Sequence, residues 1–391
     1  MQSYDIGIVG AGVVGCAIAR ELAGRRWDRP LRIIVLESHA TAGLETSARN
    51  SGVLHSGIHE NPDSLKGRLA REGSELAIAF ALRHRLPLLR TGMIIAVSWE
   101  DILRGLWREA SSLWRLWGNA RRAKIVTTWL SPSGLRRWEP HLRAAFGIAI
   151  PSVAVIDSTA FVQALQTEAA SAGVHFAFDQ RVTQIDMASS AFRLATNRQG
   201  WEVGCLINAA GLYADDIAAL AMPRKTYALA PVRGEYYEIV TERTKRLISR
   251  LVYPALPAGS VGKGIHFSPR PNGRMYLGPN TSAASGKTDY ESNRTPPELF
   301  VQAVQKFLPE LTVDDLRWAY AGIRPRLSPA ASHAGKDDFV IATDRDDPPL
   351  VNLIGIESPG LSAALAIARH VADLPAIQRR LAHRSGEPCA R

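Results

Sequence analysis

Near its start the chain reads Asp5-Ile6-Gly7-Ile8-Val9-Gly10-Ala11-Gly12-Val13-Val14-Gly15, and this stretch decides the fold. The apolar residues before Gly10 are typical of a short buried strand, and the glycines that follow have the spacing G-x-G-x-x-G. Gly10 permits a tight turn, Gly12 lets the backbone approach a pyrophosphate, and Gly15 lets helix and strand pack closely. The N–H groups at the start of the next helix, and its partial positive charge, attract phosphates.

The residues after this motif complete a strand–helix–strand unit. Helix-forming residues run from 16 to 23, a turn follows at 28–30, and a second apolar strand covers 31–36. That strand ends on Glu37, about 20 positions after Gly15, where an acid can meet the hydroxyl groups of a ribose. The combination predicts a dinucleotide-binding βαβ unit. The alternative is a glycine-rich turn in another α/β fold.

Composition narrows the class of protein. The 391 residues are 46% hydrophobic and 21% charged, and 47 basic against 37 acidic residues give a net charge of +10. Such a charge suits an anionic substrate or an anionic membrane surface. However, the arginines are scattered, and no interleaved aromatic and basic residues point to nucleic acid. Cys16, Cys205 and Cys389 are too few for a disulfide framework or a metal site, so we predict no metal and a reducing, cytoplasmic location.

Membrane attachment stays open at the level of sequence. No stretch approaches the roughly 18 uninterrupted apolar residues of a spanning helix. A helical stretch from 101 to 124 carries Trp107, Trp114 and Trp117, which could face a membrane. Aromatic residues at this spacing more often form a packing face, and we favour that interpretation. The protein is therefore expected to be cytoplasmic, with peripheral membrane contact as the alternative.

The pattern of predicted elements gives the domain organisation. Buried strands and helices recur in 1–90, 150–220 and 330–380, whereas 221–329 is rich in alternating strands. The fold class is therefore α/β (α+β overall), with a discontinuous Rossmann-like nucleotide-binding domain in the first three ranges. A substrate domain with an antiparallel sheet is inserted as 91–149 and 221–329. Residues 381–391 form a polar tail.

The loop at 46–59 is the second informative stretch. Its run Ser-Ala-Arg-Asn-Ser-Gly, residues 47–52, is dense in small residues and backbone donors. Such a run lets the main chain pass close to a planar or anionic ligand. The alternative is a flexible loop of no special function.

Five stretches in the same order along the chain resemble the D-amino-acid-oxidase-type flavoproteins. They are residues 5–37, 50–57, 208–211, 321–325 and 355–361. Within that group, residues 55–66, 232–237, and 264–267 followed by 277–280, most resemble L-2-hydroxyglutarate dehydrogenases and oxidases, with glycerol-3-phosphate dehydrogenases more distant. The resemblance implies a tightly bound FAD and oxidation of a 2-hydroxy acid to the 2-oxo acid by hydride transfer to the flavin.

The same resemblance leaves alternatives on the substrate side. An amine or amino-acid oxidase of the same fold is the runner-up, and a non-catalytic flavin-binding subunit is a third hypothesis. His59 stands where the hydroxyglutarate enzymes usually carry tyrosine. The expected partners are a small anionic hydroxy acid and an electron acceptor, which is oxygen, a quinone or an electron-transfer protein.

The resemblance and the glycine motif together assign the FAD contacts. They are Gly10, Gly12, Val13, Val14, Gly15, Glu37, Ser38, Thr46, Ser47, Arg49, Asn50, Ser51, Gly52, Val53, Val182, Ala209, Ala210, Gly211, Arg324, Pro359, Gly360 and Leu361. The second helix N-terminus, after 355–361, is expected to stabilise negative charge on the reduced flavin.

Oxidation of a hydroxy acid needs a base for the hydroxyl proton and a cation for the carboxylate. His55 is the first candidate base and His266 the second, although a histidine on an apolar strand is more often structural. Arg324 is the candidate carboxylate clamp, because a guanidinium can grip both carboxylate oxygens. Residues expected to line the substrate site are His59, Arg233, Tyr237 and Tyr253.

Overall fold

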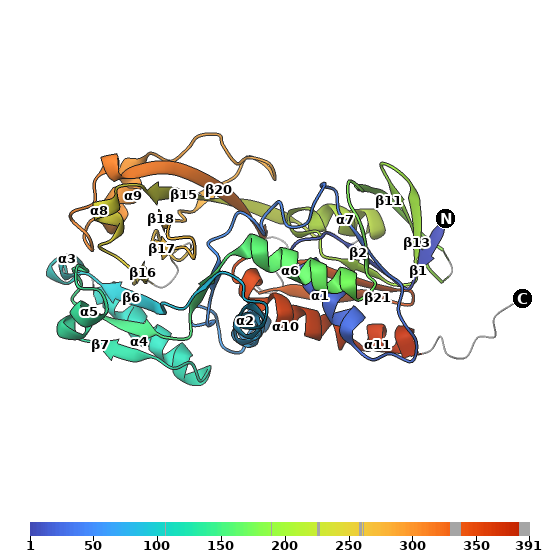
Figure 1. Cartoon of the computed structure of the whole chain (residues 1–391), viewed down its shortest axis with the longest axis horizontal. Coiled ribbons are helices and arrows are strands. Elements are labelled where there is room, and N and C mark those ends of the chain that lie inside the picture. Colours follow the sequence, from blue (N-terminus) through green and yellow to red (C-terminus); the bar gives the residue numbers. More distant parts are fainter. Residues whose placement is uncertain are drawn as a thin grey trace, which may run out of the picture. The chain divides into compact units, whose positions relative to one another are not determined.

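The chain passes back and forth between two structural units in the computed structural model (Figure 1). Unit 1 comprises Met1–Ala48, Ser158–Pro231 and Pro325–Arg391, and unit 2 comprises Arg49–Asp157 and Val232–Arg324. The structure describes residues 1–105, 107–188, 190–224, 227–257, 260, 262–328 and 338–382. Residues 49–90, which we expected in the nucleotide-binding domain, cluster with unit 2. The division into FAD-binding and substrate domains stays a prediction.

A six-stranded sheet forms the centre of unit 1, in the order β10-β3-β2-β14-β22-β21. Its strands are β2 (Ile6–Val9), β3 (Ile33–Leu36), β10 (His175–Ala177), β14 (Leu206–Asn208), β21 (Val340–Asp346) and β22 (Pro349–Ile354). All neighbours are parallel except β21 and β22. Every residue of β2, β3 and β22 is buried, as expected for a parallel sheet covered on both faces.

Helices and a second sheet cover this central sheet. The helices are α1 (Val13–Gly24), α6 (Ser158–Ser171), α7 (Ala214–Ala221), α10 (Gly360–Ala372) and α11 (Pro375–Ala382), with the 3-10 turn η1 (Gly211–Tyr213). α1 packs against α6 and α10. The second sheet has the order β1-β13-β12-β11, with β1 (Gln2–Tyr4), β11 (Val182–Met187), β12 (Phe192–Thr196) and β13 (Gly200–Val203). Ile34, Leu194 and Trp201 belong to the core between the two sheets.

The predicted βαβ unit is present as β2, α1 and β3. Helix α1 begins at Val13, three residues before the predicted start, because the last part of the glycine motif is already helical. Gly10 has a φ of +101°, and a Cβ there would lie 2.6 Å from the carbonyl oxygen of Ala209. A Cβ on Gly15 would lie 1.9 Å from the carbonyl oxygen of Gly10. Only glycine fits at these two points of the turn.

A nine-stranded sheet forms the centre of unit 2, in the order β19-β15-β18-β17-β16-β6-β8-β7 with β20 also paired to β15. Its strands are β6 (Met93–Val97), β7 (Thr128–Leu130), β8 (Phe146–Ile150), β15 (Leu229–Ile239), β16 (Leu251–Pro254), β17 (Phe267–Pro269), β18 (Met275–Leu277), β19 (Ser282–Ala283) and β20 (Leu316–Leu327). Strands β6 and β16 are parallel, so the predicted antiparallel sheet contains a parallel pair. These two strands come from separate stretches of chain, so no hairpin dictates their direction.

The remaining elements of unit 2 surround this sheet. They are the small sheet β4-β9-β5, made of β4 (Val53–Leu54), β5 (Leu88–Leu89) and β9 (Ala154–Ile156), and α2 (Leu65–Arg83), α3 (Trp99–Leu103), α4 (Trp107–Arg122), α5 (Pro132–Trp138), α8 (Glu242–Lys245), α9 (Pro297–Val304) and η2 (Val313–Asp315). Residues of β6 alternate between two cores, with Met93 and Ile95 in one and Ile94 in the other. The sheet is therefore buried on both faces around β6.

The helical stretch predicted at 101–124 is two helices, α3 and α4. Gly105 lies between them with a φ of +68°, which ends the first helix. Leu113 and Leu116 supply the buried face of α4, whereas Trp114 is 61% exposed. The Trp114 ring lies 5.7 Å from that of Trp117 and 4.9 Å from that of Trp129, so the predicted packing face is present there but remains largely exposed. The side chain of Trp107 lies outside the described residues. In the part of the chain that the structure describes, no helix is long and apolar enough to cross a bilayer.

We predict that Gly15→Ala destabilises unit 1, because its methyl group would meet a backbone oxygen at 1.9 Å. Overpacking of this kind costs about 1–3 kcal/mol or more. The matched control is Gly24→Ala at the other end of α1, where a Cβ would meet nothing within 4 Å and alanine favours helix. Urea unfolding measures both variants. Equal stability of the two variants would contradict the close contact at Gly15.

Candidate active site

The turn between β2 and α1 gathers the first group of predicted site residues, all in unit 1. Gly12 is the N-cap of α1 and has no side chain to cap it, while the N–H of Val13 donates to Ser47 Oγ at 2.9 Å. The buried carboxylate of Glu37 accepts from the N–H of Ala11 at 2.8 Å and from that of His39 at 3.0 Å. The acid at the end of β3 is thus held against the glycine turn. Ser38 is exposed beside it.

Two more predicted segments lie at the same edge of the sheet. Parallel strands present their carboxyl ends together, and β14 runs parallel to both β2 and β22. Ala209, Ala210 and Gly211 follow β14, and the N–H of Ala210 bonds to Asn208 Oδ1 at 3.2 Å. After β22, Gly360 and Leu361 begin α10, whose N-cap Pro359 provides no side-chain hydrogen bond.

The loop before α10 is anchored by an ion pair. Glu357 is buried and lies 3.1 Å from Arg326. Helices α1 and α10 both begin at the carboxyl edge of the central sheet, where their first-turn N–H groups have no partner within the helix. Such helix N-termini favour anionic groups. Val182 lies at the start of β11, where its backbone pairs with Thr196, and its predicted adenine contact stays a prediction. The glycine cradle, Glu37 and the helix termini fit the adenosine and pyrophosphate parts of FAD.

Unit 2 holds a cluster of three imidazoles around one phenol. The ring of Tyr253 stacks on that of His266 with centroids 3.7 Å apart and planes at 17°. The rings of His55 and His59 each lie 6.0 Å from Tyr253 and 6.3 Å from one another. His55 follows β4, Tyr253 lies on β16, and His266 directly precedes β17. The fold thus brings together four residues that the sequence analysis singled out.

Burial controls the protonation of this cluster. It lowers the pKa of His55 and of His59 well below the usual value, and Lys263 is the next cause for both. The pKa of His266 is lowered to about 3, again chiefly by burial. Burial raises the pKa of the Tyr253 phenol. All four rings are therefore neutral at physiological pH.

The hydrogen bonds fix which atoms of the cluster face a ligand. His266 Nδ1 lies 2.9 Å from the carbonyl oxygen of Gly264, which can only accept, so the neutral ring carries its proton on Nδ1. Its Nε2 then presents a lone pair. Within the described residues, His266 Nε2, His59 Nε2 and the Tyr253 hydroxyl have no hydrogen-bond partner. Buried polar atoms without partners indicate a polar ligand.

Cationic groups adjoin the cluster. Lys263, Arg270 and Arg324 each depress the pKa of His266, so all three act on that ring. Lys263 Nζ is 3.5 Å from Glu60, the nearby carboxylate. Arg324 is half-buried. Its Nη2 donates to the Asn280 carbonyl at 3.4 Å, and its Nη1 has no partner in the described part of the chain. This environment favours an anionic ligand.

The predicted flavin loop, residues 49–53, is held by long-range contacts in unit 2. A Cβ on Gly322 would lie 2.0 Å from the carbonyl oxygen of Arg49, so the loop passes directly against β20. Gly52 has a φ of +67°, and its N–H bonds to Asn50 Oδ1 at 2.7 Å. The loop ends in β4, which pairs with β9 and leads to His55.

Two predicted substrate residues have other neighbours. Arg233 is buried and lies 3.1 Å from Asp289 and 3.5 Å from Glu235. The Tyr237 hydroxyl donates to the carbonyl oxygen of Thr295 at 2.7 Å. Both side chains hold the 289–295 segment in place. The contacts that the structure gives Arg233 and Tyr237 are not with the histidine cluster.

Sequence reasoning missed Lys263 and Arg270. Lys263 stands between Gly262 and Gly264, which have φ values of +80° and +78°. The Gly-Lys-Gly run is the sequence signal that could have pointed to a lysine held in a sharp turn. Arg270 lies in a turn directly after β17, where the sequence gives no hint of its partners. Long-range contacts of this kind are not encoded in local pattern.

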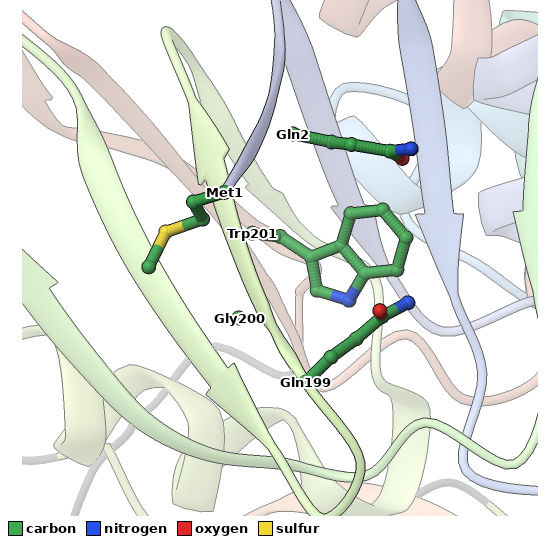
Figure 2. Close-up of a pocket in the computed structure, with 5 residues that line it drawn as sticks. All are labelled: Met1, Gln2, Gln199, Gly200 and Trp201. Atoms are coloured by element: carbon green, nitrogen blue, oxygen red, sulfur yellow. The ribbon is translucent and has the colours of Figure 1, made fainter.

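A hollow on the surface of unit 1 carries no comparable chemistry. It is lined by Met1, Gln2, Gln199, Gly200 and Trp201, where β1 meets β13. Figure 2 shows the side chains of Gln2, Gln199 and Trp201 pointing one way and that of Met1 the other. None of these side chains is a general base. Among the described residues, no group of three or more His, Cys, Asp or Glu is arranged to hold a metal ion.

Two dehydrogenases are similar in sequence to this chain over most of its length. The mitochondrial L-2-hydroxyglutarate dehydrogenase of Arabidopsis thaliana is 30% identical over 422 positions, covering 95% of this chain and 83% of that protein. The glycerol 3-phosphate dehydrogenase of Caloramator mitchellensis is 26% identical, covering 95% of this chain and 73% of that protein.

Solved structures agree with this grouping. Dithionite-reduced L-α-glycerophosphate oxidase from Mycoplasma pneumoniae with FAD bound has a TM-score of 0.83 at 27% identity, covering 97% of this chain and 95% of that one. Glycine oxidase from Geobacillus kaustophilus shares the fold, with a TM-score of 0.78 at 23% identity and the same coverage. The profile of the DAO family, described as FAD dependent oxidoreductase, matches residues 5–374. The chain belongs to this family of FAD-dependent oxidoreductases, and FAD is its cofactor.

Proposed function

We propose that this oxidoreductase converts a small 2-hydroxy acid, of the L-2-hydroxyglutarate kind, to the 2-oxo acid. The observation that carries the proposal is the cluster of neutral imidazoles with cations around it. A hydroxy acid brings a hydroxyl proton, which needs a base, and a carboxylate, which needs a cation. FAD, when bound, would supply a two-electron acceptor for the hydride. The similarity to L-2-hydroxyglutarate dehydrogenases supports the same substrate class.

His55 is our proposed base. Its ring is buried and neutral in the free protein, so it can accept the hydroxyl proton without first losing one. A pKa far below neutrality makes a weak base, but an anionic substrate beside the ring offsets the charge of Lys263. Substrate binding therefore raises the pKa of His55 towards the working pH. This coupling makes the histidine a stronger base when the substrate is present.

The other members of the cluster orient the substrate. The Tyr253 phenol keeps its proton and donates a hydrogen bond, while His266 Nε2 accepts one. Arg324 is our proposed carboxylate clamp, since its unpartnered Nη1 and adjacent Nη2 form a fork. Gly234 leaves room for this guanidinium, because a Cβ there would lie 2.7 Å from Nη2.

An amine or amino-acid oxidase is the second candidate. We retain this candidate because glycine oxidase has the same fold. Its substrate loses hydride as a neutral amine and needs no strong base. Three buried imidazoles beside one phenol would then have no role in proton removal, and for this reason we favour the hydroxy acid.

We further propose that unit 2 contacts an anionic membrane surface. Trp99 is 51%, Leu103 84% and Trp114 61% exposed, all within α3 and α4. Residues 99–126 contain six Arg or Lys and three Asp or Glu. Exposed indoles and basic side chains are the two signals that together hold a protein at a lipid headgroup layer.

Replacing the proposed base tests the proton-transfer step. His55→Asn should slow anaerobic flavin reduction by about 10²–10⁴-fold, because the hydroxyl proton loses its acceptor. The exposed His141 is the matched control, and His141→Asn should reduce the flavin at the parent rate. Stopped-flow absorbance at saturating substrate measures both variants. If His55→Asn reduces the flavin at the parent rate, another residue is the base or the protein is an amine oxidase.

The pH dependence of turnover checks the coupling between substrate and base. The pKa of His55 lies well below its usual value of 6.5, chiefly through burial, so kcat/KM should stay level as pH falls through 6.5. In the substrate complex the pKa is raised, so kcat should fall at a higher pH than kcat/KM does. Coincident acid limbs near pH 6.5 would contradict a buried neutral base.

Removing the proposed clamp should weaken binding of an acidic substrate. Arg324→Ala should raise KM by about 30- to 1000-fold, equivalent to about 2–4 kcal/mol. Arg317→Ala is the control on the same strand, since that side chain is 68% exposed and pairs with Glu238. Steady-state kinetics measures both. An unchanged KM in Arg324→Ala would clear Arg324 of this role.

Vesicle co-sedimentation tests the membrane contact. The protein should bind vesicles containing about one-third anionic phospholipid, and Trp114→Ala should reduce the bound fraction several-fold. Leu82→Ala removes another exposed apolar side chain, 55% exposed on α2, and should bind as the parent does. No binding by the parent protein, or equal effects of the two variants, would rule the surface out.

A further inference from the structure

We propose that Arg270 is a positioning residue, which holds the turn at residues 50–52 and thereby places the imidazole of His55. The proposal rests on His55 being the base of the proposed function. The sequence analysis did not single out Arg270, and its hydrogen bonds are with the turn rather than with the ring of His55.

The guanidinium of Arg270 clamps two consecutive carbonyl groups. Its Nη1 donates to the carbonyl oxygen of Ser51, and its Nη2 donates to that of Asn50 at 3.2 Å. Nη2 also donates to the hydroxyl of Tyr320, which in turn donates a hydrogen bond to the Asn50 carbonyl at 2.9 Å. Two carbonyl groups of one turn are thus satisfied by a single side chain from far along the chain.

The surroundings of Arg270 fix the guanidinium in place. It lies 5.1 Å from the ring centroid of Tyr276 and 5.9 Å from that of Tyr236, which stacks on Tyr320 at 4.5 Å. Among the described residues, no carboxylate forms an ion pair with Arg270. A half-buried cation with carbonyl, hydroxyl and aromatic partners keeps its position through them, so the turn and the side chain order one another.

The turn needs this support because its backbone is constrained. Gly52 takes a left-handed φ of +67°, and a Cβ there would lie 2.8 Å from Arg270 Nη1 and 2.5 Å from the Ile156 carbonyl oxygen. The Gly52 carbonyl in turn accepts from the N–H of Ile156 at 2.8 Å. Arg270 therefore closes one side of the turn and β9 the other.

His55 is the next residue after the two-residue strand β4. Only Val53 and Leu54 separate it from the clamped turn, and they pair with Val155 and Ala154. So short a strand transmits a shift of the turn directly to the ring that follows it. A displacement of about 1 Å at a reacting group slows a reaction by about 10²-fold.

The first experiment measures the clamp without using any substrate. Hydrogen exchange of the FAD-loaded protein, read by mass spectrometry, should show Arg270→Gln raising the exchange rate of amides in 50–56 by about tenfold or more. Arg270→Lys should do the same, because an ammonium cannot donate as a fork to both carbonyls. Arg274→Gln is the control from the same turn, since its side chain is 57% exposed and faces Glu238.

The second experiment measures the consequence for the base. At saturating substrate, Arg270→Lys should reduce the flavin about 10- to 100-fold more slowly than the parent while its KM changes less than threefold. A general loss of structure would instead lower thermal stability and FAD content together. Millimolar ethylguanidinium should restore part of the rate in Arg270→Ala.

Unchanged exchange at 50–56 in Arg270→Gln would overturn the clamp. Faster exchange with parental reduction rates would overturn the link to His55. If no hydroxy acid reduces the parent protein, the proposed function fails, whereas the exchange result still decides whether Arg270 holds the turn.

Discussion

Burial keeps three imidazoles neutral around the ring of Tyr253, and the chemistry of unit 2 depends on this constraint. Desolvation disfavours the imidazolium form, and Lys263, Arg270 and Arg324 add repulsion. The result is a set of proton acceptors in a positively charged environment. Such an environment suits a substrate that carries both a carboxylate and a proton to be removed.

The two units differ in the chemical groups that they offer to a ligand. In unit 1, the predicted cofactor contacts are mainly backbone groups, since Gly10 and Gly15 permit a tight turn and helix termini provide N–H groups. Backbone contacts tolerate many side-chain changes, which agrees with identities of only 30% and 25% to two L-2-hydroxyglutarate dehydrogenases. In unit 2, the proposed substrate contacts are side chains, and His59 contributes a neutral imidazole to them.

A feature could be predicted from the sequence where its residues lie close together along the chain, and was missed where they come from distant segments. The βαβ unit was predictable because strand, glycine turn, helix and Glu37 lie within one local stretch. His55 and Arg324 came from family resemblance, and only the fold shows that Tyr253 stacks on His266. Lys263 and Arg270 were not predicted as site residues because their neighbours come from distant segments of the chain. The exposure of Trp114 was missed because helical spacing alone does not reveal which face is buried.

The central claim is that the buried imidazoles serve removal of a hydroxyl proton. An anaerobic screen of the yellow, FAD-loaded protein against L-2-hydroxy acids and the matching amino acids tests it most directly. The account predicts that dicarboxylic 2-hydroxy acids of the hydroxyglutarate kind bleach the flavin band and that the amino acids do not. Bleaching by amino acids alone would contradict it.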